Sequence, residues 1–155
     1  MPTYTIRPAR EDDAEAIVRV TQRSVEGLAR DHYTPEQIEG WTRGRGAEYY
    51  KPAIAAGRMA VAETNGEVVA FVDAIPGELT RLFIVPEAAG HGLGRQLMDW
   101  GMKRARDGHT GKVKIEATRN AVGFYERFGF KVVGHGSFSR GAGNPPIEIV
   151  YMEEA

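Results

Sequence analysis

The chain contains no cysteine. This absence excludes a disulfide framework, a thiolate metal site and a cysteine nucleophile. An excess of basic residues is missing too, because 20 Lys and Arg stand against 21 Asp and Glu, giving a formal net charge of -1. Binding to the phosphate backbone of nucleic acids depends on such an excess, so nucleic acid is not expected as a partner. The four histidines show no ligand spacing such as i, i+4, so no metal site is expected.

Long apolar runs are also absent. No stretch approaches the roughly 20 apolar residues that cross a bilayer, and residues 1–7 lack the apolar core of a signal peptide. We therefore expect a cytoplasmic protein that does not contact membranes. A length of 155 residues is usual for one domain, so residues 1–155 are expected to form a single domain.

The periodicity of apolar residues predicts a mixed α/β order of elements. Thr34, Pro35 and Gln37 mark a helix start, since a hydroxyl, a proline and a returning amide suit the first turn. Asn65-Gly66 predicts a type I′ hairpin turn. The predicted elements are a strand over 4–8, a helix over 14–28 begun by Asp12 and Glu15, a helix from 34, a helix over 42–57 broken at Gly44 and Gly46, strands over 59–63, 67–74 and 80–85, a helix over 93–105, a strand over 113–117, a helix over 121–128, a strand from 131, a turn over 141–146 and a strand over 147–152.

A glycine-rich loop with Gly90, Gly92 and Gly94 joins the strand that ends at Val85 to the helix from Leu93. A helix start offers unpaired N–H groups and the positive end of a dipole, and glycine lets a phosphate approach the backbone. The spacing fits neither the dinucleotide fingerprint nor a Walker loop. Two interpretations stay open: a site for a phosphate ester, or a tight turn that packs a helix on a sheet.

The loop and a later segment together resemble the GCN5-related N-acetyltransferase (GNAT) superfamily. The family patterns are V-x-P-x-x-Q/R-x-x-G-x-G/A and N-x-x-A-x-x-F-Y-x-x-x-G-F, and the order of predicted elements agrees over nearly the whole chain. Ala89 stands at the Gln/Arg position and Thr118 at the Asn position, so two side-chain contacts differ from the family's. The matching residues are Val85, Pro86, Gly92, Gly94, Ala121, Phe124, Tyr125, Gly129 and Phe130.

The resemblance implies a GNAT fold of the α/β (α+β) class, with a mixed, mostly antiparallel sheet of about seven strands and about four helices. It implies transfer of an acetyl group from acetyl-CoA to a primary amine, preferably of a small molecule, by direct attack in a ternary complex. The pyrophosphate would lie on backbone N–H groups of the loop and the pantetheine arm along the strand before it. The implied cofactor residues are Phe83, Ile84, Val85, Gly90, His91, Gly92, Leu93, Gly94, Arg95, Thr118, Ala121 and Tyr125.

Three catalytic tasks follow from that reaction. Tyr125 would donate a proton to the departing thiolate, because a phenol with a pKa near ~10 is protonated at neutral pH. A backbone N–H of Ile84 or Val85 would stabilise the developing oxyanion. The alternative for Tyr125 is a half-buried aromatic of the core.

A general base would take a proton from the amine. Glu78 and Glu116 are the leading candidates, with His91 and Asp73 behind them. The alternative for each of these carboxylates is a solvated or ion-paired group.

His32, Tyr33 and Trp41 are candidates for the substrate wall, where this superfamily varies. In the alternative interpretation these residues are structural: they form a capped loop, with Trp41 in a small core. Two other functions stay open as alternatives: a non-catalytic acyl-CoA-binding or sensing module, and a nucleotide-binding regulatory domain. The sequence leaves a homodimer open.

Overall fold

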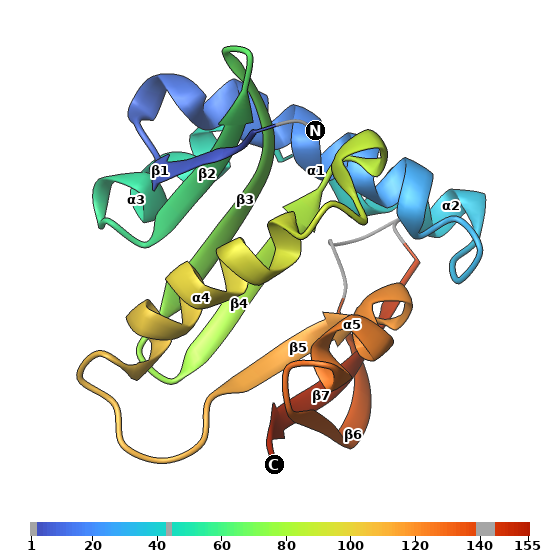
Figure 1. Ribbon diagram of the computed structural model, residues 1–155. Helices are drawn as coiled ribbons and strands as arrows, with labels where there is room; N and C mark the ends of the chain where they lie inside the picture. Colours follow the sequence, from blue (N-terminus) through green and yellow to red (C-terminus); the bar gives the residue numbers. More distant parts are fainter. Residues whose placement is uncertain (1–2, 43–44, 139–144) are drawn as a thin grey trace.

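The computed structural model describes residues 3–42, 45–138 and 145–155. The described residues form a seven-stranded sheet in the order β1-β2-β3-β4-β5-β7-β6 (Figure 1). Only β4 and β5 are parallel, so the expected mixed, mostly antiparallel sheet is confirmed. The strands are β1 (Thr5–Pro8), β2 (Met59–Thr64), β3 (Glu67–Ile75), β4 (Glu78–Ile84), β5 (Lys114–Thr118), β6 (Phe130–Phe138) and β7 (Ile147–Glu154).

Five α-helices accompany this sheet in the described part of the chain, at the five places where the sequence predicts helices. None of them is long and apolar enough to cross a bilayer. Short 3-10 turns precede α1 and α5, and another follows β4. The helices are α1 (Ala14–Leu28), α2 (Pro35–Thr42), α3 (Ala47–Ala55), α4 (Leu93–Arg106) and α5 (Val122–Glu126).

Local signals set several of these boundaries. The Thr34 N–H donates to Gln37 Oε1 (2.9 Å) and the Gln37 N–H donates to Thr34 Oγ1 (3.1 Å), so the predicted capping box at α2 is confirmed. The box before α1 uses Asp13 rather than Asp12, because the Arg10 N–H donates to Asp13 Oδ2 at 2.7 Å.

The hairpin between β2 and β3 has the expected turn. Asn65 and Gly66 have φ of 52° and 76°, the positive values that a type I′ turn requires. The predicted helix from residue 34 is α2, and the broken helix predicted over 42–57 appears as α3 alone, with Gly46 as its N-cap. Gly44, and residues 141–144 of the predicted turn, lie outside the described residues.

Helices cover the two faces of β3. Tyr50 of α3 contacts Phe71 at a centroid distance of 5.9 Å. Gly101 of α4 lies so close to Val72 and Leu79 that an added Cβ would be 2.9 and 2.5 Å from their side chains. Since successive strand residues point to opposite faces, α3 and α4 pack on opposite sides of the sheet.

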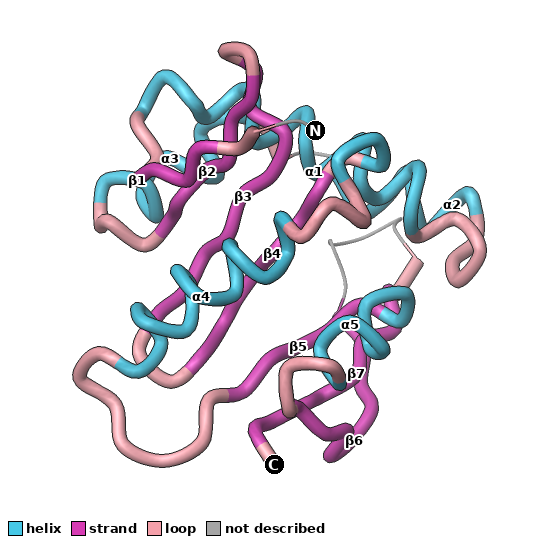
Figure 2. Tube along the Cα trace, viewed as in Figure 1, coloured by secondary structure: helices cyan, strands magenta, loops and turns pink. Residues whose placement is uncertain are grey.

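The sheet opens between β4 and β5. These strands pair only at Glu78 with Lys114 and Leu79 with Ile115, and Figure 2 shows them diverging beyond that point. Farther along, β4 pairs with β3 alone and β5 with β7 alone. One edge of β4 is therefore unpaired from Thr80 onward within the described residues.

A β-bulge lies at the point of divergence. Asp73 pairs with Arg81 and Ala74 with Leu79, so Thr80 is an extra residue on β4. The Thr80 hydroxyl donates to the Asp73 carbonyl at 2.8 Å and holds the bulge. The bulge shifts the alternation of β4, which places Leu79 on the α4 face and Arg81 on the α3 face.

Candidate active site

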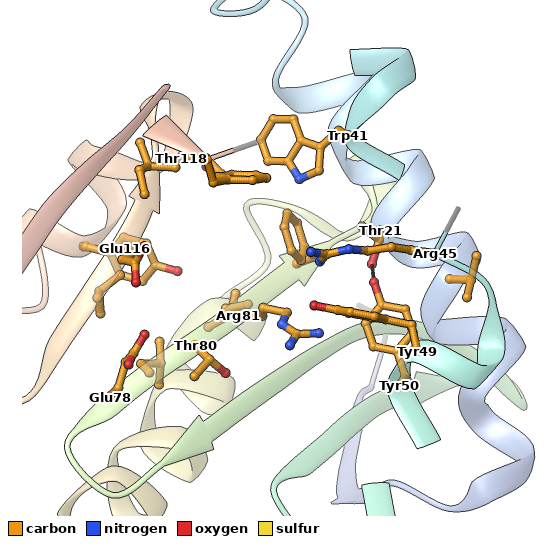
Figure 3. Close-up of a pocket in the computed structure, with 18 residues that line it drawn as sticks. Thr21, Trp41, Arg45, Tyr49, Tyr50, Glu78, Thr80, Arg81, Glu116 and Thr118 are labelled. Carbon is orange, nitrogen blue, oxygen red and sulfur yellow. Dashed lines mark hydrogen bonds between the residues drawn. The ribbon is translucent and has the colours of Figure 1, made fainter. Parts of the chain in front are cut away.

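A cavity of about 460 Å³ lies at the opening between β4 and β5. Its walls come from residues 78–83 of β4, from β5, and from side chains of the first three helices and their connections. Figure 3 shows the carboxylates of Glu78 and Glu116 on one side, with Arg45 and Arg81 on the other. We call this cavity the central pocket. Its volume is in the usual range for a small-molecule site.

Tyr125 reaches the central pocket from α5. It is only 5% exposed, and its ring packs against Phe124 (5.1 Å) and Phe130 (6.3 Å). Burial raises the pKa of the Tyr125 phenol above its usual value. The phenol is therefore protonated at neutral pH and can donate a proton into the pocket.

Glu78 and Glu116 face the pocket from neighbouring strands. Glu78 is partly buried, and burial, followed by the negative charge of Glu116, raises the pKa of its carboxyl group. A carboxylate with a raised pKa is a stronger base than an exposed one. The structure thus brings the two leading base candidates together.

The weaker base candidates do not reach the pocket. Asp73 is fully buried and accepts from Arg58 Nε at 3.1 Å and Arg58 Nη2 at 2.9 Å. The alternative interpretation, an ion-paired carboxylate, is therefore right for Asp73. His91 is exposed on the glycine-rich loop and is not part of the pocket wall.

Only one of the two proposed oxyanion donors faces the opening. The Val85 N–H donates to the Val69 carbonyl of β3 at 3.0 Å, and the Val85 side chain is in the core. Val85 as an oxyanion donor was therefore wrong. Because N–H groups alternate along a strand, that of Ile84 is directed to the unpaired edge. Phe83, its neighbour, lines the pocket.

The geometry of the glycine-rich loop is compatible with both interpretations of the sequence. Gly90 and Gly92 have φ of 82° and 79°, and a Cβ added to either would meet no atom within 4 Å. Gly92 is the N-cap of α4, so the space above these residues faces a helix start. Gly94 instead permits close packing, since its Cβ would be 2.5 Å from the ring of Phe124.

The remaining cofactor candidates surround this loop. The Leu93 side chain belongs to the core, so only its backbone is available to a ligand. The exposed Arg95 side chain lies over the ring of Phe128 at 5.3 Å. Thr118 lines the central pocket, whereas Ala121 is the N-cap of α5 and lies outside the pocket wall.

Two of the three predicted substrate residues lie elsewhere. The His32 carbonyl accepts from Arg119 Nη1 at 3.0 Å, and His32 borders a separate hollow. The Tyr33 hydroxyl donates to the Glu148 carbonyl at 2.6 Å and accepts from the Arg119 N–H at 2.8 Å. These three hydrogen bonds hold His32 and Tyr33 outside the wall of the central pocket, so their assignment to the substrate wall is corrected.

The position of Trp41 fits both interpretations of this residue. It lines the central pocket. It is also 3% exposed, lies 5.1 Å from the ring of Tyr33 and belongs to a small second core.

Sequence reasoning missed a cluster of aromatic and basic residues opposite the carboxylates. The guanidinium of Arg81 lies 5.0 Å from the ring of Tyr49 and 5.5 Å from that of Tyr50. Arg45 lies 4.0 Å from the ring of Tyr49, and the Tyr50 hydroxyl bonds Thr21 Oγ1 at 3.1 Å. Arg81 comes from β4 and Thr21 from α1, and both are distant in sequence from Arg45 and the two tyrosines at α3, so the sequence does not reveal the cluster.

No group of three or more potential metal ligands occurs among residues 3–42, 45–138 and 145–155.

A model of the acetyltransferase (GNAT) domain matches residues 29–148. The chain belongs to the GNAT acetyltransferase family. As a GNAT protein it is an acetyl-CoA-dependent N-acetyltransferase.

Relatives and solved structures extend the comparison. Over 148 residues the chain is 28% identical to the peptidyl-lysine N-acetyltransferase YjaB of Salmonella typhimurium, covering 94% of this chain and 97% of YjaB. A GCN5-related N-acetyltransferase from Rhodopseudomonas palustris has a TM-score of 0.89 at 23% identity, covering 100% of this chain and 97% of that one. PaiA N-acetyltransferase of Thermoplasma acidophilum, in complex with coenzyme A, has a TM-score of 0.77 at 23% identity and 98% coverage of each chain. The GNAT fold is thus shared along the whole chain.

Proposed function

We propose that this GNAT enzyme acts in the cytoplasm and transfers the acetyl group of acetyl-CoA to the primary amine of a small molecule, by direct attack in a ternary complex. One observation carries the proposal: Glu78, Glu116 and Tyr125 line one cavity beside the unpaired edge of β4. The cavity thus combines proton acceptors for an amine with a proton donor for a thiolate.

The residues present fit acetyl-CoA. The backbone N–H and C=O of Ile84, on the unpaired edge of β4, can pair with the amides of a pantetheine arm, as an added strand would. The open space over Gly90 and Gly92, at the start of α4, suits a pyrophosphate. The coenzyme A held by PaiA supports this assignment. When bound, acetyl-CoA supplies the thioester carbonyl that the amine attacks.

The chain's own residues then move protons. Glu78 takes a proton from the amine, directly or through one water, as the new C–N bond forms. The Ile84 N–H donates to the carbonyl oxygen as negative charge develops on it. As the C–S bond breaks, Tyr125 donates its proton to the sulfur and recovers one from solvent. The products are an N-acetylated amine and CoA.

A lysine side chain of a protein is the second candidate acceptor, because the relative YjaB is a peptidyl-lysine acetyltransferase. The small-molecule acceptor is preferred since a cavity of about 460 Å³ encloses a whole ligand of that size. A non-catalytic acyl-CoA sensor has no use for a buried proton donor facing two carboxylates.

Calorimetric titration with acetyl-CoA and CoA, followed by thiol-release assays across an amine panel, tests the proposal. The panel includes a lysine-containing peptide. We expect micromolar binding of CoA and CoA release that requires a small amine. Binding of CoA without acetylation of any amine would favour the sensor, and acetylation of the peptide alone would favour the second acceptor.

A further inference from the structure

The charged side chains of the central pocket are separated by sign. Glu78 and Glu116 lie on the side of β5, and Arg45 and Arg81 lie on the side of α3 (Figure 3). No other charged residue belongs to the described wall of the pocket. Two negative charges therefore face two positive charges across one small cavity.

Arg81 has hydrogen-bonding capacity that the protein does not use. Its Nη1 is buried and has no hydrogen-bond partner among the described residues. Its Nη2 lies 3.6 Å from Asp73, but that carboxylate already receives two hydrogen bonds from Arg58. A buried N–H without a partner is costly, so this group favours a ligand that accepts a hydrogen bond.

Arg45 adds a second positive charge to the same end. Burial, and to a smaller extent the charge of Arg81, lowers the pKa of the Arg45 guanidinium. The ring of Tyr49 lies beside both guanidinium groups, at 4.0 Å from Arg45 and 5.0 Å from Arg81. An anion bound between the two arginines would relieve their repulsion, and a carboxylate matches the planar guanidinium fork.

We propose that the acceptor is an amino acid, whose amine lies at Glu78 and Glu116 and whose carboxylate binds Arg81 and Arg45. This inference rests on the proposed function and names its substrate class. A zwitterion has no net charge and matches the two opposed ends of the pocket. A polyamine would leave both arginines unpaired, and a phosphate monoester would add a negative charge that the balanced wall does not offset.

Matched acceptors test the proposal in the thiol-release assay. Free amino acids are compared with their carboxamides, with the decarboxylated amines, with phosphoethanolamine and with a lysine-containing peptide. Because hydrogen bonds to charged groups contribute about 1.5–3 kcal/mol, we expect kcat/KM for the best amino acid to exceed that of its carboxamide by about 10- to 100-fold.

Arg81→Gln and Arg45→Gln then localise the effect. Each should raise KM for the amino acid by about tenfold or more and leave the carboxamide nearly unchanged, which removes the preference. Arg104→Gln is the matched control, since Arg104 also lies over an aromatic ring, that of Trp100 at 4.6 Å, but on α4 outside the central pocket. The Arg104→Gln variant should prefer the amino acid over its carboxamide by the same factor as the parent.

The amino-acid acceptor is overturned if kcat/KM is equal for amino acids and their carboxamides, or if phosphoethanolamine or the peptide is preferred. In either case the proposed acetyl transfer is unaffected. If CoA binds and no amine is acetylated, the proposed function fails. Calorimetric titration of amino acids into the CoA-loaded protein then decides the inference by itself. If an amino acid binds to the parent and Arg81→Gln abolishes this binding, the amino-acid acceptor is supported. If no amino acid binds to the parent, the amino-acid acceptor is overturned.

Discussion

Glu78 and Arg81 are three positions apart on β4 and both line the central pocket. In a regular strand, residues separated by three point to opposite faces. The bulge at Thr80 removes this conflict, because it inserts one unpaired residue between them. The bulge therefore places a carboxylate and a guanidinium in one cavity, and the sheet opens at the same place.

The first prediction concerns the general base. Glu78→Gln should lower kcat by about 10²- to 10⁴-fold, because an amide cannot take the proton of the amine. Glu116→Gln should keep most of the activity. Both rates are measured with saturating acetyl-CoA and the best acceptor. Loss of activity in Glu116→Gln, with Glu78→Gln active, would exchange the two roles.

The pH dependence gives a second prediction for the same pair. Glu78 acts in its ionised form, so kcat should fall as the pH falls through its pKa, which burial and Glu116 raise above the usual value. Removing the charge of Glu116 lowers the pKa of Glu78. The acidic limb of kcat in Glu116→Gln should therefore lie at lower pH than in the parent. An unchanged limb would mean that another group limits the rate.

A third prediction tests the glycine-rich loop. Gly92→Ala places a methyl group in the open space at the start of α4 and should weaken CoA binding at least tenfold by calorimetry. Gly108→Ala is the control, since Gly108 also has a positive φ (71°) and open space around it, but follows the end of α4. Both variants bear a similar backbone strain, of about 1 kcal/mol. Equal CoA affinity in the two would place the pyrophosphate elsewhere.

Gly94 is unsuitable for this test. A side chain there would collide with Phe124, so the expected result is a loss of stability as well as of binding. The sequence interpretation treated the three glycines alike, and the structure separates their roles.

A fourth prediction concerns stability. Hydrogen bonds from Arg7 Nη1 (2.8 Å) and Nη2 (2.9 Å), aided by the Arg10 N–H, lower the pKa of Asp13. Asp13→Asn should lower the free energy of unfolding at pH 7 by about 2–3 kcal/mol. Because the pKa is lower in the folded protein, this contribution is present above the unfolded pKa of ~3.9 and is lost as the pH falls through the folded pKa.

Urea unfolding at several pH values measures this difference. The gap between the parent and Asp13→Asn should shrink toward acidic pH. Asp12→Asn is the control, because Asp12 is exposed and makes only a 3.6 Å ion pair with Arg10, so its effect should stay within about 0.5 kcal/mol. A gap that does not vary with pH would assign the stabilisation to packing.

Local features of the fold could be predicted because neighbouring residues produce them. The Thr34–Gln37 box and the Asn65-Gly66 turn depend on contacts within a few positions, and both appear as expected. The positions of Tyr33 and Arg81 depend on distant segments. Tyr33 is directed by the Glu148 carbonyl, 115 positions away. Arg81 is directed by a bulge that only the pairing of β3 and β4 reveals.

The site was predictable to a similar extent. The family resemblance named Tyr125, Glu78 and Glu116, which the structure brings to one cavity. The basic end of that cavity could not be seen in the sequence, because Arg45 and Arg81 are separated by two strands and act together only after α3 packs on the sheet. Composition does not reveal it either, since the chain as a whole is nearly neutral.

The last prediction concerns Tyr125. Tyr125→Phe removes only the O–H group, and the ring should keep its contacts with Phe124 and Phe130. If the phenol protonates the thiolate, kcat should fall by about 10- to 10³-fold. The affinity for CoA and the KM for acetyl-CoA should stay close to the parent values, because the proton donor acts as charge develops on sulfur. Tyr4→Phe is the control and should leave kcat unchanged, because Tyr4 directly precedes the edge strand β1 and lies outside the wall of the central pocket.

The pH profile of the parent adds a check on Tyr125. Burial raises the pKa of this phenol, so ionisation of Tyr125 should cause no loss of rate up to the ordinary tyrosine value of ~10. A basic limb near neutral pH that disappears in Tyr125→Phe would contradict the burial seen here. If Tyr125→Phe retains the parent kcat on the best acceptor, the phenol is not the acid, and water or another group protonates the thiolate. If kcat falls while CoA affinity is kept, Tyr125 is the proton donor and the sensor alternative is excluded.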